Sequence, residues 1–255
     1  MLLKKTFSLF SLLSSLTLLH SLQIQDDLVQ IYNLPQQGPI KGQITLQSSD
    51  SQPEKILVEI IDYLPHAEGK TEFLKAGSLP RSNSSWIQIK NQEIVLAPNT
   101  NFVLEYDLQP PADLSPGSYW CMIRLVPEVD SDSQGVQQRI AYGMQVIARQ
   151  TPTPEGNVSL ENLKVVMREG QKNLQCDLKN TSTIDMLLQS KLEVYDSTGQ
   201  RILESKGPKQ RLYPDSDLSF NFPLDLKAGS YQAFIVFEDG QDNFFGIQRQ
   251  IDVAP

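Results

Sequence analysis

Few side chains in this 255-residue chain are of the types that catalyse reactions or hold metal ions. Histidine is the usual base of hydrolytic triads, and His66 is the only histidine outside the first 21 residues. It follows Pro65 in a polar stretch, where a solvated loop histidine is the simpler interpretation. Zinc needs several Cys or His ligands close together, and the only cysteines are Cys121 and Cys176. We therefore expect no metal site, no cofactor and no enzymatic activity.

One acidic turn begins like a calcium loop. Asp130, Asp132, Gln134 and Gly135 match the start of that pattern, but Ala141 stands where the bidentate Glu belongs. A solvated hairpin tip is the favoured interpretation.

Glycoside hydrolysis would need two carboxylates on facing strands. Asp62 alone lies on the core-side positions of a predicted strand, and one acid is not a pair. A carbohydrate-active or hydrolytic enzyme is therefore only a remote alternative.

The two cysteines fall on the apolar faces of predicted strands in different halves of the chain. A disulfide would need their Cα atoms within about 7 Å of each other, whereas two separate cores hold them apart. Buried cysteine behaves as a small apolar residue. The sequence therefore predicts two free, buried thiols.

The strand around Cys121 begins with a Tyr motif that occurs twice. In LSPGSYWCMIRL, from Leu114, every second residue from Tyr119 to Leu125 is apolar, and LKAGSYQAFIVF, from Leu226, repeats the motif and the alternation. A Tyr at the entry to a late strand resembles the tyrosine corner of immunoglobulin-type sandwiches. We therefore expect an all-β protein with two tandem immunoglobulin-like β-sandwich domains.

A second repeated motif supports this duplication. LAPNTNF, from Leu96, matches LYPDSDL, from Leu212, as Leu-x-Pro followed by polar residues and an apolar one. Outside the leader, no helical period of useful length occurs.

The chain begins with a basic pair and an uncharged apolar run, which is typical of a secretory signal peptide over residues 1–21. A retained membrane anchor is the alternative, although the run is short for a span. Loss of the leader changes the formal net charge from −8 to −10. An acidic chain with dispersed charges does not suit nucleic acid or anionic lipid. We expect an exported protein, periplasmic or on the cell surface, without a membrane span after cleavage.

The remaining chain divides at QTPTPEG, because prolines two apart favour a short extended linker. The expected parts are a first domain over residues 22–149 with a polar insertion at 64–85, a linker over 150–156, and a second domain over 157–255. In the first domain we expect strands at 40–46 and 54–63, a hairpin within 86–108, the Tyr strand, and a last strand at 139–149.

An apolar patch is predicted on the outer face of the first domain. If Tyr119 and Cys121 point into the core, their neighbours in the strand point outward, because side chains alternate with a period of two. The predicted patch consists of Leu57, Ile61, Tyr63, Trp120 and Met122. Such a patch usually marks an interface. The alternative is that the insertion, with Phe73 and Leu74, folds over the patch and buries it.

The order of leader, larger sandwich, short linker and smaller sandwich resembles that of the periplasmic pilus-assembly chaperones of the PapD type. The segment from Trp86 to Leu125 is also similar to these proteins and to bacterial surface modules such as WxL-protein domains. The segment RIAYGMQVIARQTP, from Arg139, is similar to the last strand of the chaperones' first domain and to the start of the linker that follows it. The resemblance implies that this strand pairs with an exported partner, such as a fimbrial-type subunit. The implied contact residues are Arg139, Ile140, Tyr142, Met144 and Val146.

These patterns favour a non-enzymatic, chaperone-like binding protein that recognises another exported protein through a sheet edge or a sheet face. A structural or adhesin-type module of the envelope, without a client, is the alternative.

Overall fold

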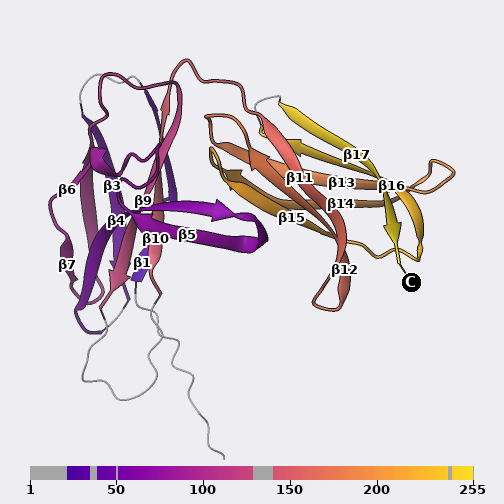
Figure 1. Cartoon of the computed structure of the whole chain (residues 1–255). Helices are drawn as coiled ribbons and strands as arrows, with labels where there is room; N and C mark the ends of the chain where they lie inside the picture. The colour runs from indigo at the N-terminus through magenta and orange to yellow at the C-terminus, as the bar shows by residue number, and fades with distance from the viewer. Residues whose placement is uncertain (1–21, 35–38, 50, 129–139, 241–242, 255) are drawn as a thin grey trace, which may run out of the picture.

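A computed structural model describes residues 22–34, 39–49, 51–128, 140–240 and 243–254 (Figure 1). The predicted leader, Arg139 and the acidic turn from Asp130 to Gly135 lie outside these ranges. The described chain is built from β-strands, with two short 3-10 turns, η1 (Ala67–Gly69) and η2 (Ser84–Trp86). The predicted all-β, two-sandwich fold is confirmed.

Two sheets enclose the first core. One sheet has the order β1 (Leu22–Ile24), β3 (Ile40–Ser48), β8 (Asn101–Leu108) and β6 (Ile87–Ile89). The other has the order β2 (Val29–Leu34), β10 (Tyr142–Gln150), β9 (Gly117–Pro127), β4 (Glu54–His66) and β5 (Lys70–Lys75), and β7 (Glu93–Leu96) also pairs with β4. Alternate residues of β3, β8 and β9 fill the space between the sheets, as their sequence period predicts.

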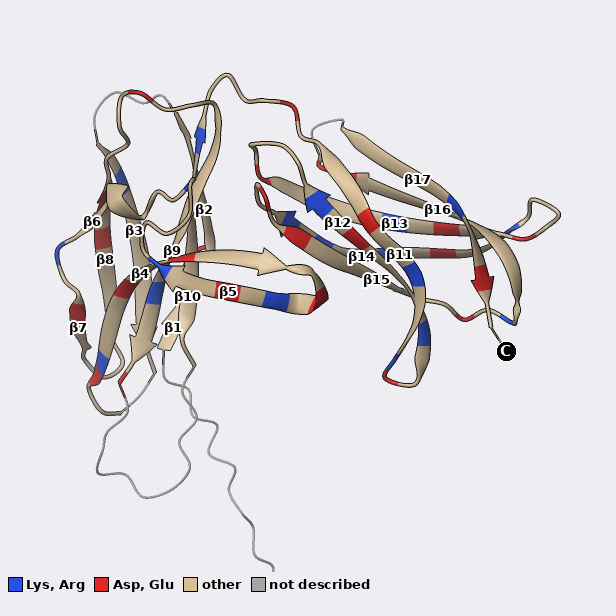
Figure 2. Cartoon of the chain, viewed as in Figure 1, with Lys and Arg blue, Asp and Glu red and all other residues tan. Residues whose placement is uncertain are grey.

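The second sandwich has its own core. A three-stranded sheet has the order β11 (Val158–Arg168), β12 (Gln171–Asn180) and β15 (Asp217–Pro223). It packs on a sheet with the order β14 (Arg201–Leu212), β13 (Met186–Tyr195), β16 (Gly229–Glu238) and β17 (Phe244–Val253). Acidic and basic residues are distributed over both domains (Figure 2).

Both predicted tyrosine corners are present. The hydroxyl of Tyr119 donates to the carbonyl of Ser115 at 3.0 Å, and that of Tyr231 donates to Lys227 O at 3.0 Å. Each bond reaches back four residues, so each ties the loop before its strand to the strand itself.

The repeated Leu-x-Pro motif forms the same turn twice. Asn99 and Asp215, which follow the prolines, both have positive φ, 52° and 61°. The next residue then donates its hydroxyl to the second residue of the motif: Thr100 to Ala97 O at 2.7 Å, and Ser216 to Tyr213 O at 2.8 Å. The duplication therefore extends to individual hydrogen bonds.

One local prediction is wrong, and the segment predicted as a polar insertion has regular strand structure. The segment 86–108 is not a simple hairpin, because β6 pairs with β8 while β7 crosses to β4 in the other sheet. The expected polar insertion at 64–85 continues β4 to His66 and returns as β5, so it forms a hairpin that projects towards the second domain (Figure 1).

Cys121 and Cys176 are free and fully buried, one in each core, as predicted. In the described part of the chain, no helix has the length and apolar character required to span a membrane.

Candidate functional site

The outer face of the first domain meets the second domain at a buried aromatic cluster. Trp120 and Met122 leave β9 on the side opposite Tyr119 and Cys121, as strand alternation predicts. The indole N–H of Trp120 donates to the carbonyl oxygen of Tyr63 at 2.9 Å, which ties β9 to β4.

Tyr63 and Trp120 do not form an exposed patch, because each is only 2% exposed. They belong to a small core with Ile147 and Tyr213, which we call the interdomain cluster. Tyr213 comes from the second domain, and its ring lies 5.0 Å from that of Trp120. Leu64 and Leu79 of the predicted insertion also pack against the cluster, but Phe73 is exposed. Tyr213 of the second domain and two leucines of the predicted insertion therefore share in covering the patch.

The other three patch residues are partly buried on the same outer face. Leu57 and Ile61 flank Glu59 on β4, and Arg124 Nε donates to the carboxylate of Glu59 at 2.7 Å. An ion pair thus interrupts the predicted apolar surface. Met122 packs at the edge of the interdomain cluster.

A chain of hydroxyls satisfies the polar atoms of the interdomain cluster. Tyr63 Oη donates to Tyr213 Oη, which donates to Gln145 Oε1 of β10 at 2.6 Å. Burial raises the pKa of both tyrosines, so both stay neutral. Tyr213 is the second residue of its Leu-x-Pro turn, and this position carries its side chain out of the second domain.

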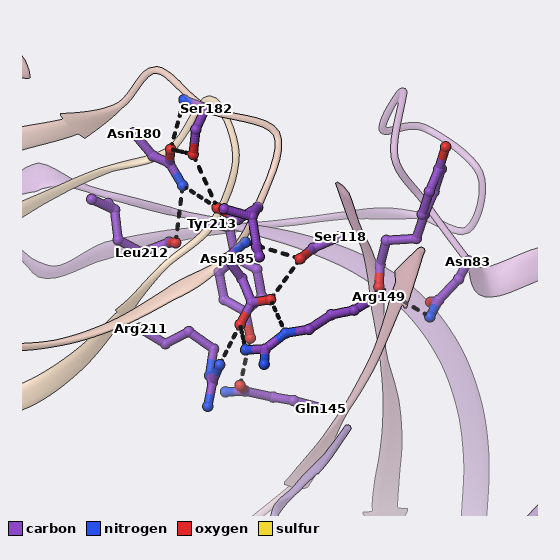
Figure 3. A network of polar contacts seen from close by, with 12 residues as sticks. Asn83, Ser118, Gln145, Arg149, Asn180, Ser182, Asp185, Arg211, Leu212 and Tyr213 are labelled. Carbon is purple, nitrogen blue, oxygen red and sulfur yellow. Dashed lines mark hydrogen bonds and ion pairs between the residues drawn. The ribbon is translucent and has the colours of Figure 1, made fainter. Parts of the chain in front are cut away.

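A buried carboxylate provides the second link between the domains (Figure 3). Asp185, in the loop before β13, accepts two 2.8 Å hydrogen bonds from Arg149, through Nε and Nη2. Arg211 Nη1 and the hydroxyl of Ser118, the latter at 2.6 Å, donate to the same carboxylate. Ser118 and Arg149 belong to the first domain, so the Asp185 side chain joins the two domains directly.

The charge of Asp185 is stabilised in place. Burial alone would raise the pKa of this carboxyl, but the hydrogen bond and charge of Arg149, the Ser118 hydroxyl and the charge of Arg211 together lower it. The hydrogen bonds from Asp185 also raise the pKa of Arg149. The junction is therefore an ionised, charge-assisted network.

Backbone contact at this junction requires a glycine. Ser118 N donates to Thr183 O at 2.8 Å. Gly117 has φ +122°, and a Cβ on it would lie 2.2 Å from Thr183 O. Only a residue without a side chain allows the two backbone segments, around positions 117 and 183, to approach this closely.

The hairpin formed by residues 61–75, which we call the clasp hairpin, makes a third link. The main-chain N–H groups of Ala67 and Glu68 donate to Asp217 Oδ2 at 3.2 Å and to Ser219 Oγ at 2.8 Å. Both acceptors lie on β15 of the second domain. The tip of the hairpin is thus attached to the neighbouring sheet.

His66 belongs to this contact and is not a solvated loop residue. Its Nδ1 lies 3.2 Å from Asp217 Oδ1, and its Nε2 lies 3.5 Å from Glu72 Oε2. Both ring nitrogens face carboxylates, and neither faces a hydroxyl or thiol nucleophile. The arrangement suits a structural contact.

Asp62 also has a structural role. It is fully buried and accepts hydrogen bonds from Leu79 N at 2.9 Å and from Ser82 Oγ at 2.7 Å. These bonds hold the segment after β5 against the sheet.

A cavity of ≈ 330 Å³ lies beside the interdomain cluster, between the clasp hairpin and the second domain. Its lining combines apolar and polar side chains: Tyr63, Pro65, Thr71, Phe73, Met122, Gln145, Gln210, Arg211, Tyr213 and Leu218. Among the described residues, no group of His, Cys, Asp and Glu is arranged to hold a metal ion.

The predicted contact residues of the last strand differ in how far they are buried. Met144 and Val146 are fully buried in the core of the first domain, so their side chains are not available to a partner. Tyr142 is partly buried, and its hydroxyl donates to Leu22 O at 2.5 Å. Ile140 is 57% exposed.

The strand itself has one partly open edge. β9 pairs with β10 along Tyr142 to Gln150, whereas β2 pairs with its other side only from Gln145 to Gln150. Among the described residues, no strand pairs with Tyr142 to Met144 on that second side.

No protein-family model matches the chain, and no curated protein matches its sequence. The fold is similar to that of a chain in a chaperone and tip-adhesin complex of CFA/I fimbriae biogenesis, with 12% identity, a TM-score of 0.50, and coverage of 92% of this chain and 100% of that one. The chain has the PapD-like two-domain fold. The class 5 fimbriae chaperone CfaA has a similar fold at 11% identity and a TM-score of 0.49. The match covers 92% of this chain and 100% of CfaA. The complex of the SafA pilin and the SafB chaperone from Salmonella enterica also contains a similar chain. The match has 12% identity and a TM-score of 0.46, and it covers 90% of this chain and 96% of that one.

The PapD-like resemblance predicted from the sequence is thus confirmed at the level of the fold. The interdomain residues Tyr213, Asp185, Arg149 and Arg211 were not predicted. One feature of the sequence could have indicated Tyr213. The repeated Leu-x-Pro turns differ at their second position, which is Ala97 in the first turn and a large aromatic residue in the second.

Proposed function

We propose that this chain is an exported, non-enzymatic, chaperone-like binding protein that recognises another extracytoplasmic protein by adding a strand of that protein to the free edge of β10. The observation that carries the proposal is that β2 begins to pair with β10 only at Gln145. The edge of β10 from Tyr142 to Met144 is therefore open in the described part of the chain. Added strands gain affinity from main-chain hydrogen bonds.

The main-chain N–H and C=O groups of Gly143 point towards the open side of β10. Gln145 N donates to Leu28 O at 2.8 Å, on the side of β2. Because the direction of N–H and C=O groups alternates along a strand, those of Gly143 face the same way, beyond the end of β2. A partner strand would continue the line of β2 and pair there.

The surroundings of the edge suit an extended apolar segment. Ile140 is exposed next to the open edge, and Leu28 and Ile31 are exposed where β2 begins to cover it. Gln145, at which the covered part begins, also lines the interdomain cavity. The edge and the cavity thus share this one residue.

Copurification from the cell envelope tests the proposal. Ile140→Asp should abolish recovery of the partner with little loss of stability, because the residue is exposed and contributes little to the core. Val103→Asp is the matched control, since Val103 is an exposed apolar residue on β8 in the other sheet. Equal partner recovery by both variants would contradict binding at β10, and a native chain that binds no protein would favour a structural module.

Export is tested separately, by mass spectrometry of the mature amino terminus. Cleavage near Ser21 is expected. Recovery of the chain with Met1 in the cytoplasm would contradict export and with it the choice of partners.

A further inference from the structure

β17 forms the outer edge of the sheet β14-β13-β16-β17 in the second domain, far along the chain from β10. It pairs with β16 at every position from Phe244 to Val253, without a register shift. Among the described residues, no strand pairs with its other side. The result is a long, regular edge whose outward-facing main-chain groups pair with no strand in the described part of the chain.

The hydrogen bonds of the hairpin show which groups face outward. Asp239 N donates to Asn243 O at 3.3 Å, so these two residues form a hydrogen-bonded pair. Such pairs alternate along an antiparallel ladder, so the odd-numbered residues of β17 bond to β16. The even-numbered residues direct their N–H and C=O groups to the free edge. Consistent with this, Gln248 O accepts a hydrogen bond from the exposed side chain of Arg249 at 3.1 Å.

Other sheet edges carry features that discourage pairing with another chain. β14 contains Lys206, Pro208 and Lys209 and has two irregularities in its register. β11 has a bulge between Leu160 and Asn162. Lysine, proline and bulges are the usual means of blocking an edge strand. The sequence of β17, FFGIQRQIDV, contains neither lysine nor proline, and Phe244 at its start is exposed.

We propose that β17 pairs in antiparallel orientation with β17 of a second copy of this chain, about a twofold axis at Gln248. With the axis there, Gln248 faces Gln248 of the second copy, and Phe244 faces Asp252 of the second copy. Every outward-facing main-chain group from Phe244 to Asp252 then has a partner. An axis at Arg249 would also pair the outward-facing main-chain groups, but it would place two guanidinium groups directly opposite each other, which is unfavourable.

The side chains also favour this register. On the face that packs on the core, Phe245 lies opposite Ile251 of the second copy, and this apolar pair occurs twice because of the symmetry. Phe245 and Ile251 already contact the core of the second domain. The pairing therefore extends both the sheet and its apolar face, and no like charges lie directly opposite each other.

Disulfide trapping tests the register. Gln248→Cys should form an intermolecular disulfide on mild oxidation, because Cα atoms in a hydrogen-bonded pair are about 5.5 Å apart, within disulfide range. Gln250→Cys is the matched control and should not cross-link to itself, because it faces Gly246 of the second copy. The native thiols are fully buried and should not interfere. Equal cross-linking of both variants, or of neither, would overturn the proposed pairing.

Sedimentation velocity provides an independent measurement. The unmodified chain should be dimeric at high concentration, and Gln248→Pro should be monomeric with an unchanged circular dichroism spectrum, because the N–H that it removes faces away from β16. A native chain that stays monomeric at its highest soluble concentration would contradict the proposal. If Gln248→Pro does not fold, the cysteine variants still decide it.

Discussion

The ring of Tyr213 stacks on the indole of Trp120 across the boundary between the domains, with centroids 5.0 Å apart and planes inclined by 28°. An aromatic pair of this kind is stabilised by apolar burial and by ring contact. Together with the Asp185 network and the clasp hairpin, it fixes the orientation of two domains whose cores are otherwise separate.

Trp120→Ala should destabilise the first domain by about 3–5 kcal/mol, because a buried indole and its hydrogen bond to Tyr63 O are both lost. Urea unfolding followed by circular dichroism measures this effect. Phe73→Ala removes an exposed ring from a neighbouring strand and should change stability by less than about 0.5 kcal/mol. Equal effects of the two variants would mean that the interdomain cluster does not contribute to stability.

Asp185→Asn should cost about 3–5 kcal/mol, because it leaves Arg149 and Arg211 without their carboxylate. Asp215→Asn removes the same charge from an exposed turn, where Asn tolerates the positive φ, and should be nearly neutral. Thermal unfolding and small-angle scattering would report stability and domain orientation. Unchanged scattering by Asp185→Asn would contradict the proposed role in fixing the domains.

The same carboxylate predicts how the junction responds to pH. The pKa of Asp185 is lowered in the folded protein, so its contribution is fully present above the unfolded value of about 3.9. The contribution is lost only as the pH falls through the lower folded pKa. The difference in unfolding free energy between the native chain and Asp185→Asn should thus be constant from neutral pH to about pH 4 and should shrink below it.

Gly117→Ala should weaken the contact between the domains, because the new Cβ would meet Thr183 O and the φ of +122° disfavours a side chain. Backbone strain of this kind costs about 1–3 kcal/mol. Gly229→Ala, at the same position of the repeated motif, is the control, since a Cβ there comes no nearer than 3.1 Å to Tyr231 Oη. A larger radius of gyration is expected for the first variant alone.

Both thiols should react slowly with alkylating reagents in the native protein. Burial raises the pKa of Cys176 to about 12 and that of Cys121 well above its ordinary value, so little reactive thiolate is present at neutral pH. Labelling in denaturant should be rapid and should modify both residues. Fast native labelling would show that the two cores open readily.

Strand periodicity carried most of the fold prediction. The alternation after Tyr119 and Tyr231 identified which residues enter each core, and the Tyr corners followed from the repeated motif. The clasp hairpin was missed because nearly all of β5 is exposed, so its sequence has no alternation to detect.

The interdomain contacts were missed for a different reason. Alternation correctly directs Trp120 away from the core of its own domain, but it does not show what lies opposite. The covering ring, Tyr213, comes from a turn far along the chain, where no period applies. Likewise, Asp185 and Arg149 lie in a loop and in a strand of different domains, and only the folded chain brings them together.

The second position of the Leu-x-Pro turn is where the two copies differ in what their side chains contact. In both copies, the carbonyl of the second residue accepts the bond that closes the turn, so the turn does not depend on that residue's side chain. Ala97 leaves the position small and exposed, whereas the second copy carries a tyrosine there. The side chain at this position can therefore differ between the two copies, and in the second copy it joins the domains, while the hydrogen bond of the turn stays the same.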